Sequence, residues 1–223
     1  MLSERQIEIL ESKGLPTEYD QLTGGQKSAI LAIEDMMLYL DKKYPNEVFS
    51  YSGYVEGMLL EKEHLFVDCK YGEVTVYRDL SVDPPAYEDT YNEAKASIVY
   101  EDIIRAFVSR SIDQKDFTLS VSVGKCTSED WTEETLLSLC SVDARLFVRE
   151  SVGEERFDKM CQELSEYLGQ NSGDNGVSVG FYLIKEDRFY SELPSAFDGL
   201  DSTVLVLKEK QYDQYPGGSR KFY

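Results

Sequence analysis

The spacing of apolar residues changes its period near Glu47, and this change constrains the fold more than any other feature of the sequence. Before this point, two capping boxes each precede apolar residues at helical spacing. The capping pairs are Ser3 with Gln6 and Thr23 with Gln26. After this point, short β-rich runs alternate with turn-like segments. We therefore predict an α+β protein that begins with two helices and an antiparallel meander.

The second half of the sequence repeats the order strand, helix, strand. Phe117 to Val123 alternates with period two, Glu154 to Leu168 has helical spacing, and Val177 to Ile184 is an apolar strand. This order predicts a βαβαβ-like half with a mixed sheet. Two successive prolines at Asp83-Pro84-Pro85 cannot both sit in a strand ladder, so they end the meander. The expected domains are 1–83 for the helical pair and meander, 84–211 for the second half, which can be continuous with the first, and 212–223 for a flexible tail.

The chain is strongly acidic, with 42 acidic and 23 basic residues and a formal net charge of −19. It lacks the basic footprint of duplex nucleic-acid binders, so we expect no nucleic-acid partner. The longest uncharged stretch, Asn175 to Ile184, is about half of the roughly 20 apolar residues that a membrane-spanning helix needs. The first residues show no secretory signal. We therefore expect a soluble cytoplasmic protein without membrane contact.

Four cysteines and one histidine limit the reactive chemistry of the chain. The sequence has no Cys-x-x-Cys pair, and Cys69, Cys140 and Cys161 fall in apolar patterns, which predicts reduced core thiols. Cys126 lies in a polar stretch, so the pattern does not place its thiol in the core. Because His64 is the only histidine, catalytic triads, Cys-His pairs and two-histidine metal sites lack a partner. We expect neither a metal nor a cofactor.

Tyrosines among carboxylates are the main functional signal. The acidic segment from Asp83 to Glu93 carries two tyrosines, and its part after the prolines is predicted to be a surface loop. Aromatic rings beside carboxylates suit a basic, arginine-rich protein surface. We therefore expect a non-catalytic acidic protein-binding module, such as an inhibitor or antitoxin-like neutraliser of a basic protein. The expected contact residues are Asp83, Tyr87, Glu88, Asp89, Tyr91 and Glu93.

Two alternatives remain open at this stage. Asp68 and Lys70 end a predicted strand downstream of Glu56, an order also found in nucleases that hold Mg²⁺ through carboxylates. The enzymatic alternative is thus a metal-dependent nuclease or phosphohydrolase that uses these three residues, although the pattern recurs at Glu11-x-Lys13 and elsewhere. The other alternative is a structural component of a larger assembly. The sequence indicates no oligomeric state.

Overall fold

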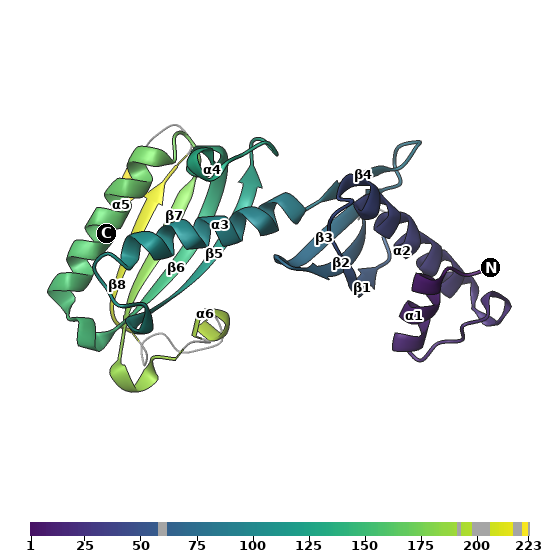
Figure 1. The fold of residues 1–223 in the computed structure, drawn as a ribbon, viewed down its shortest axis with the longest axis horizontal. Coiled ribbons are helices and arrows are strands. Elements are labelled where there is room, and N and C mark those ends of the chain that lie inside the picture. Colours follow the sequence, from purple (N-terminus) through teal and green to yellow (C-terminus); the bar gives the residue numbers. More distant parts are fainter. Residues whose placement is uncertain (58–61, 191–192, 198–205, 216–219, 223) are drawn as a thin grey trace. The chain divides into compact units, whose positions relative to one another are not determined.

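The chain divides into two compact units, Met1–Tyr91 and Asn92–Tyr223 (Figure 1). This computed structural model describes residues 1–57, 62–190, 193–197, 206–215 and 220–222. Unit 1 contains helices and an antiparallel sheet, and unit 2 contains helices and a mixed sheet, so the predicted α+β class is confirmed. The division falls after Tyr91 and not at Asp83, because the strand that follows the two prolines pairs with the first sheet.

Unit 1 begins with two helices whose starts are fixed by side-chain caps. They are α1 (Glu4–Ser12) and α2 (Gly24–Lys43), with the 3-10 helix η1 (Tyr19–Gln21) between them. Both predicted capping boxes are present. In each, the N-cap hydroxyl accepts a hydrogen bond from the glutamine N–H, and the glutamine side chain accepts one from the N-cap N–H. Local sequence therefore sets where both helices begin.

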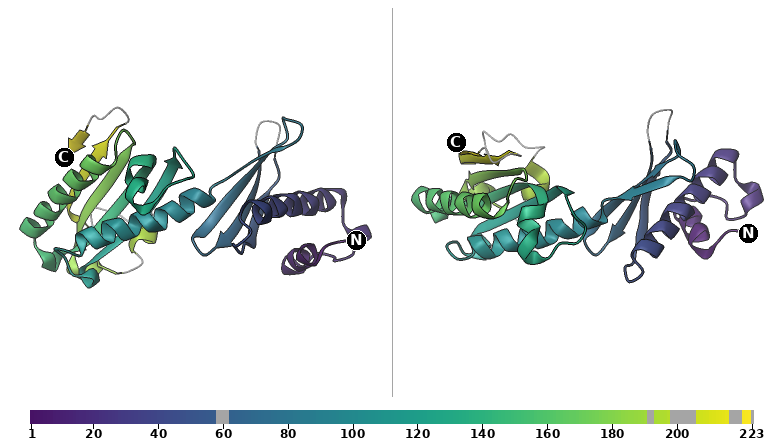
Figure 2. Two further views of the ribbon diagram at one scale, coloured as in Figure 1. Left: turned by 45° about the horizontal axis from the view of Figure 1, so that its top comes forward. Right: turned by 90° about the horizontal axis from the view of Figure 1, so that it is seen from above.

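An antiparallel sheet in the order β1-β2-β3-β4 completes unit 1. The strands are β1 (Ser50–Val55), β2 (Glu63–Cys69), β3 (Gly72–Asp79) and β4 (Ala86–Asp89). Alternate residues of β2 and β3 are 0% exposed and form the inner face, namely Leu65, Val67, Val74 and Val76. Arg78 and Tyr87, on the same side, reach Asp35 of α2. Helix α2 therefore covers the inner face, and the opposite face points away from α2 (Figure 2).

Unit 2 alternates helices with strands. Its long helices are α3 (Tyr91–Val108), which begins at the last residue of unit 1, and α5 (Glu154–Asn171). Its short helices are α4 (Glu133–Leu139), α6 (Leu193–Ala196), η2 (Gln114–Asp116), η3 (Glu150–Val152) and η4 (Glu186–Arg188). Its strands are β5 (Phe117–Cys126), β6 (Cys140–Arg149), β7 (Val177–Ile184), β8 (Val206–Gln214) and β9 (Arg220–Phe222). No helix in the described part of the chain combines the length and apolar character that crossing a lipid bilayer requires.

The second sheet is mixed, in the order β5-β6-β7-β8-β9. Strands β6 and β7 are parallel and are connected through α5, whereas the other described neighbours are antiparallel. The core of unit 2 lies between one face of this sheet and the helices, and includes Tyr100, Ile104, Leu146, Phe157 and Phe181, all 0% exposed. On the edge strand β5, the Val123 N–H donates a hydrogen bond to Ser97 Oγ of α3 at 2.9 Å.

The C-terminal residues differ from the predicted flexible tail. Tyr212 and Gln214 belong to β8 and are 4% and 2% exposed, and the Tyr212 side chain is part of the core of unit 2. The segment is polar in composition, so the prediction missed that alternate residues of a strand point into the core. Strand β8 begins at Val206, and residues 203–205 lie outside the described residues.

Two of the four cysteines form a disulfide, which corrects the prediction of a reduced thiol at Cys140. Cys126 ends β5 and Cys140 begins β6, and the two residues are directly paired across the strands and bonded through their Sγ atoms. Cys161 is buried, and burial raises its pKa to about 12. Cys69 is half-buried, and its Sγ accepts a hydrogen bond from the Tyr71 N–H at 3.4 Å.

Candidate binding surface

Asp89, one of the predicted contact residues, is buried and joins β4 to α2. Its Oδ2 accepts hydrogen bonds from Tyr39 Oη at 2.6 Å and Lys43 Nζ at 2.9 Å. Its Oδ1 accepts hydrogen bonds from Tyr44 Oη at 2.8 Å and from the Tyr91 N–H at 3.1 Å. Burial alone raises the pKa of Asp89, but the hydrogen bonds from the three side chains outweigh burial and hold this pKa below its usual value. With a side chain 1% exposed, Asp89 is not offered to a partner.

The two predicted contact tyrosines also pack inside unit 1. The ring of Tyr87 stacks on Tyr39 with centroids 5.0 Å apart, and Tyr87 Oη donates a hydrogen bond to Asp35 at 2.9 Å. Tyr91 is 7% exposed, and its ring centroid lies 4.1 Å from that of Tyr44. Burial raises the pKa of both Tyr87 and Tyr91. Tyr91 is therefore a core residue, and Tyr87 presents only part of its ring.

The remaining predicted contacts, Asp83, Glu88 and Glu93, are spread over both units. Asp83 is exposed before a cis peptide bond to Pro84, and Glu88 is exposed on β4 with an ion pair to Lys62 at 2.7 Å. Glu93 is half-buried in the first turn of α3 and belongs to unit 2. The segment predicted as a surface loop is therefore a strand and a helix start, because its alternate residues reach α2.

The structure does not bring the proposed catalytic residues together. Val55 pairs with His64 at one end of the β1–β2 ladder, so Glu56 follows that end, whereas Asp68 pairs with Ser50 at the other. Four residues of strand separate these ends by about 13 Å. Lys70 is exposed, and its Nζ lies 2.7 Å from Glu47. Within the described residues, no group of three or more His, Cys, Asp or Glu side chains could hold a metal ion.

The sheet face of unit 1 that points away from α2 carries apolar and aromatic side chains on neighbouring strands. We call it the outer face; it comprises Gly53, Val55, His64, Phe66, Asp68, Glu73, Thr75, Tyr77 and Glu88. Val55, His64 and Tyr77 lie side by side in one row across β1, β2 and β3. Val55 is 48% exposed, and the rings of His64, Phe66 and Tyr77 are half-buried. This face therefore leaves apolar surface in contact with water.

The rings of the outer face hold one another in place. The ring of His64 meets that of Tyr77 edge-on, with centroids 4.8 Å apart, and it also meets Phe66 edge-on at 6.4 Å. Phe66 lies over Gly53 of the neighbouring strand, where its Cδ2 is 3.5 Å from the position that a Cβ would take. Part of the role of Phe66 is thus to cover a glycine in the sheet. The rings form an ordered surface that loses little conformational entropy on binding.

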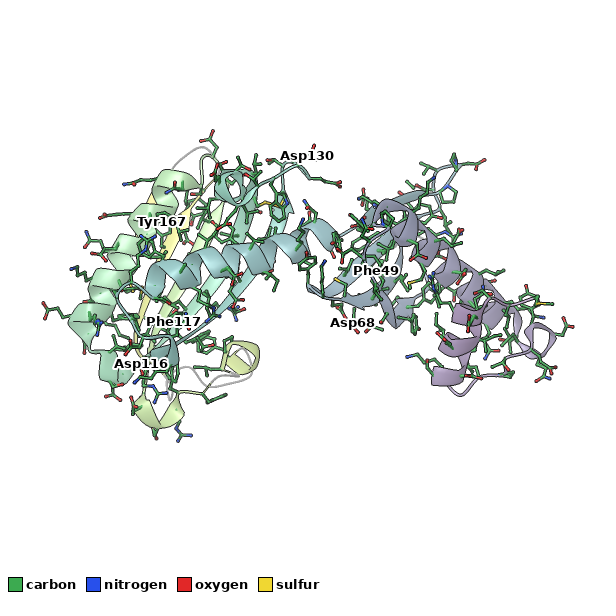
Figure 3. The ribbon with its side chains drawn as sticks, viewed as in Figure 1. Phe49, Asp68, Asp116, Phe117, Asp130 and Tyr167 are labelled. Atoms are coloured by element: carbon green, nitrogen blue, oxygen red, sulfur yellow. A yellow bond between two sulfur atoms is a disulfide. The ribbon has the colours of Figure 1, made fainter. Side chains whose placement is uncertain are left out.

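Carboxylates lie beside these rings on the outer face. Asp68, labelled in Figure 3, lies on β2 directly opposite Glu73 of β3, and both residues are exposed. Like charges at opposed strand positions are destabilising. This pair lies two residues along the strands from Phe66 and Thr75, a distance of about 7 Å. The outer face therefore holds an unfavourable pair of negative charges next to an aromatic cluster, and a bound cation would relieve it.

The corresponding face of the second sheet has a different composition. One row across β5 to β8 contains only hydroxyls and carboxylates, namely Ser122, Asp143, Ser178 and Asp213. A shallow hollow of about 360 Å³ lies over this row. Two aromatic residues of this sheet outside the main core, Phe147 and Tyr182, pack with Leu193 of α6. This row of side chains is therefore polar, as expected for a solvated sheet face, whereas the same face is apolar where a helix lies on it.

Sequence reasoning did not identify the outer face. The structure places His64 on β2, an inner strand between β1 and β3, where its ring contacts those of Phe66 and Tyr77. One signal was available in the sequence, because apolar residues between His64 and Val67 fall on both faces of the strand, Leu65 and Val67 on one face and Phe66 on the other. A strand with one face in water would carry polar residues on that face.

Comparison with protein-family models finds no match, and comparison with curated proteins finds none either. Among solved structures, the chain is similar to a crystal structure described as a DUF5037 family protein from Ruminococcus gnavus ATCC 29149. The identity is 13% and the TM-score is 0.48, over 86% of this chain and 94% of that chain.

Proposed function

We propose that this chain is a non-catalytic acidic protein-binding module of the cytoplasm, and that it docks a basic segment of a partner protein on the outer face. One observation carries this proposal. Phe147 and Tyr182, on the second sheet, pack with a helix, whereas the rings of the outer face stay partly exposed beside carboxylates. An ordered aromatic cluster with a charged rim is the composition of an interface hot spot.

The chemistry of the outer face favours a basic occupant. An arginine or lysine placed beside Asp68 and Glu73 would offset their mutual repulsion. Its aliphatic stem would bury apolar surface against Phe66, at about 25 cal/mol for each Å² removed from water. A cation over an aromatic face adds about 0.5–2 kcal/mol. The net charge of −19 would in addition speed the encounter with a basic protein.

Occlusion is the mechanism that follows. A basic protein that acts on nucleic acid uses a positively charged surface to hold the phosphate backbone. An acidic module that covers this surface competes with the phosphates for the same cations. The module thereby acts as an inhibitor or antitoxin-like neutraliser, without catalytic groups of its own.

The first test uses an oligo-arginine peptide as the probe, with binding followed by NMR of the full chain at increasing salt. We expect amide shifts on the outer face and an affinity that falls with salt. The variant Asp68→Asn/Glu73→Gln weakens binding. The matched control Asp143→Asn/Glu209→Gln removes the same two charges from exposed positions of the second sheet and leaves the affinity nearly unchanged. Equal losses for both pairs would mean unspecific charge attraction and would refute the docking site.

The second test concerns the aromatic part of the site. Tyr77→Ser removes a ring from the outer face, and we expect a loss of roughly tenfold or more in affinity, typical of an interface hot spot. The control is Tyr190→Ser, at a tyrosine that is 38% exposed in unit 2. If both variants bind the peptide as the wild type does, the outer face is not the docking surface.

A further inference from the structure

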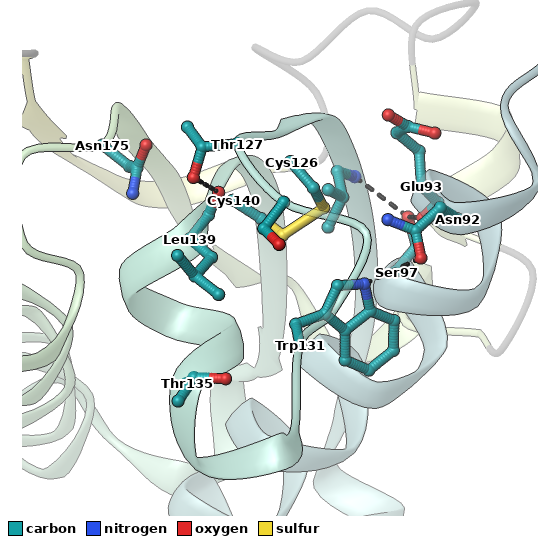
Figure 4. Close-up of a disulfide and its surroundings, with 12 residues drawn as sticks. Asn92, Glu93, Ser97, Cys126, Thr127, Trp131, Thr135, Leu139, Cys140 and Asn175 are labelled. Carbon is teal, nitrogen blue, oxygen red and sulfur yellow. Dashed lines mark hydrogen bonds between the residues drawn. A yellow bond between two sulfur atoms is a disulfide. The ribbon is translucent and has the colours of Figure 1, made fainter. Parts of the chain in front are cut away.

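The disulfide between Cys126 and Cys140 closes a loop that packs on α3 (Figure 4). The loop runs over residues 127–139 and ends with α4. Trp131, the only tryptophan of the chain, donates a hydrogen bond from its Nε1 to Asn92 Oδ1 of α3 at 2.8 Å. Lys95, one turn further along α3, places its Nζ 5.0 Å from the centroid of the Trp131 ring. Trp131 therefore connects the loop to the first turns of α3.

The two halves of this loop are held by different contacts. Leu136 and Leu137 of α4 are buried in the core of unit 2, and Leu139 O accepts hydrogen bonds from both the N–H and Oγ1 of Thr127, at 2.7 and 2.9 Å. These contacts do not depend on the disulfide. The segment from Ser128 to Thr132 is mostly exposed, and half-buried Trp131 is its anchor on α3. The disulfide adds a covalent restraint at the base of this segment, so we expect its loss to let the segment move more on α3 while the sheet stays intact.

We propose that Cys126 and Cys140 are a reversible thiol–disulfide exchange site, which takes a dithiol reductant and controls how the segment 128–132 packs on α3. This step rests on the cytoplasmic location proposed above, because disulfides in reducing compartments are mostly redox-sensing or catalytic. A pair on directly opposed strand positions can re-form without a search, because the ladder keeps the two residues adjacent in the reduced state. Exchange at this pair is independent of what binds the outer face.

The exchange step is a two-electron reduction. A thiolate of the dithiol attacks Cys126 Sγ, since Cys126 is half-buried whereas Cys140 is 0% exposed. The protein S–S bond breaks, a mixed disulfide forms at Cys126, and Cys140 leaves as a thiolate that takes up a proton. The second thiol of the reductant then displaces Cys126, which is also protonated. The products are two protein thiols and one oxidised dithiol.

Trp131 provides the readout. The full chain is equilibrated in buffers of reduced and oxidised dithiothreitol, thiols are trapped with iodoacetamide and located by mass spectrometry, and acrylamide quenching of Trp131 is measured on the same samples. We expect quenching to rise toward that of an exposed indole, with the same midpoint as the appearance of thiols at Cys126 and Cys140. The far-ultraviolet circular dichroism stays unchanged, and re-oxidation restores the original quenching.

Variants separate the disulfide from the other cysteines. Cys126→Ser/Cys140→Ser shows the quenching of the reduced wild type in every buffer, whereas Cys69→Ser responds as the wild type does. Asn92→Ala removes the hydrogen bond to Trp131 and raises quenching in the oxidised state while the disulfide stays formed. The proposal is overturned if Trp131 quenching is the same in both redox states, or if the thiols appear only together with loss of secondary structure.

Discussion

Replacing Asp89 by alanine tests whether the buried carboxylate holds β4 on α2. The Asp89 side chain is 1% exposed and accepts four hydrogen bonds. Asp89→Ala removes all four and leaves the Lys43 ammonium without this carboxylate partner. Removing one partner of a buried ion pair costs about 3–5 kcal/mol. The Lys43 side chain is 29% exposed and recovers part of its hydration, so we expect the lower end, about 3 kcal/mol.

Hydrogen exchange followed by mass spectrometry is the suitable assay, because a chain of two units need not unfold in one step. A loss of about 3 kcal/mol corresponds to a roughly 100-fold loss of protection in the peptides of α2 and β4. The control Glu88→Ala, on the neighbouring residue, removes an exposed ion pair with Lys62 and costs less than about 1 kcal/mol. If Asp89→Ala changes protection no more than this control, the network does not stabilise unit 1.

The same network predicts a dependence on pH. Because the folded-state pKa of Asp89 lies below its usual value, its contribution is complete above the unfolded pKa of about 3.9 and is lost as the pH falls through the folded pKa. The difference in protection between wild type and Asp89→Ala should therefore be constant near neutral pH and shrink in acid. A difference that grows as the pH falls would contradict this assignment.

Three further predictions concern unit 2. Gly180→Ala would place a Cβ 2.6 Å from Tyr182 Oη, and we expect the free energy of unfolding to fall by about 1–3 kcal/mol. Thermal unfolding followed by Trp131 fluorescence measures this loss. An unchanged melting temperature would show that the Tyr182 ring moves aside freely. Phe157→Ala empties a fully buried position and should cost about 3–5 kcal/mol in urea unfolding, and a loss below about 1 kcal/mol would place Phe157 outside the core. Burial raises the pKa of Cys161 to about 12, so this thiol should resist iodoacetamide at pH 8 until the chain unfolds. Mass spectrometry of labelled peptides checks this. Labelling of Cys161 in the folded chain would contradict its burial.

The elements that the sequence predicts well are those fixed by neighbouring residues. The capping boxes at Ser3 and Thr23 mark both N-terminal helix starts, and the apolar stripe of Glu154 to Leu168 marks α5. Strand β4 was missed because its burial depends on distant partners. Asp89 is buried because Tyr39 and Lys43 of α2 and its C-cap Tyr44 supply donors, and no local pattern reports contacts over 45 to 50 residues.

The disulfide and the candidate site were missed for a related reason. Cys126 and Cys140 are 14 residues apart without a motif, and only the register of β5 with β6 makes them neighbours. The outer face likewise depends on register, which sets Asp68 against Glu73 and His64 beside Tyr77. Composition indicated tyrosines and carboxylates, but it could not distinguish those buried under α2 from those that stay exposed.

The hydrogen bond from Val123 to Ser97 has a consequence for how copies of this chain behave toward one another. Strand β5 ends the described order of the second sheet, so its outward N–H groups could pair with a strand of another molecule. One of these donors, the Val123 N–H, already donates its hydrogen bond to the Ser97 hydroxyl of the same chain. With this donor satisfied inside the molecule, the margin of the second sheet is a poorer template for polymerisation between copies of the chain.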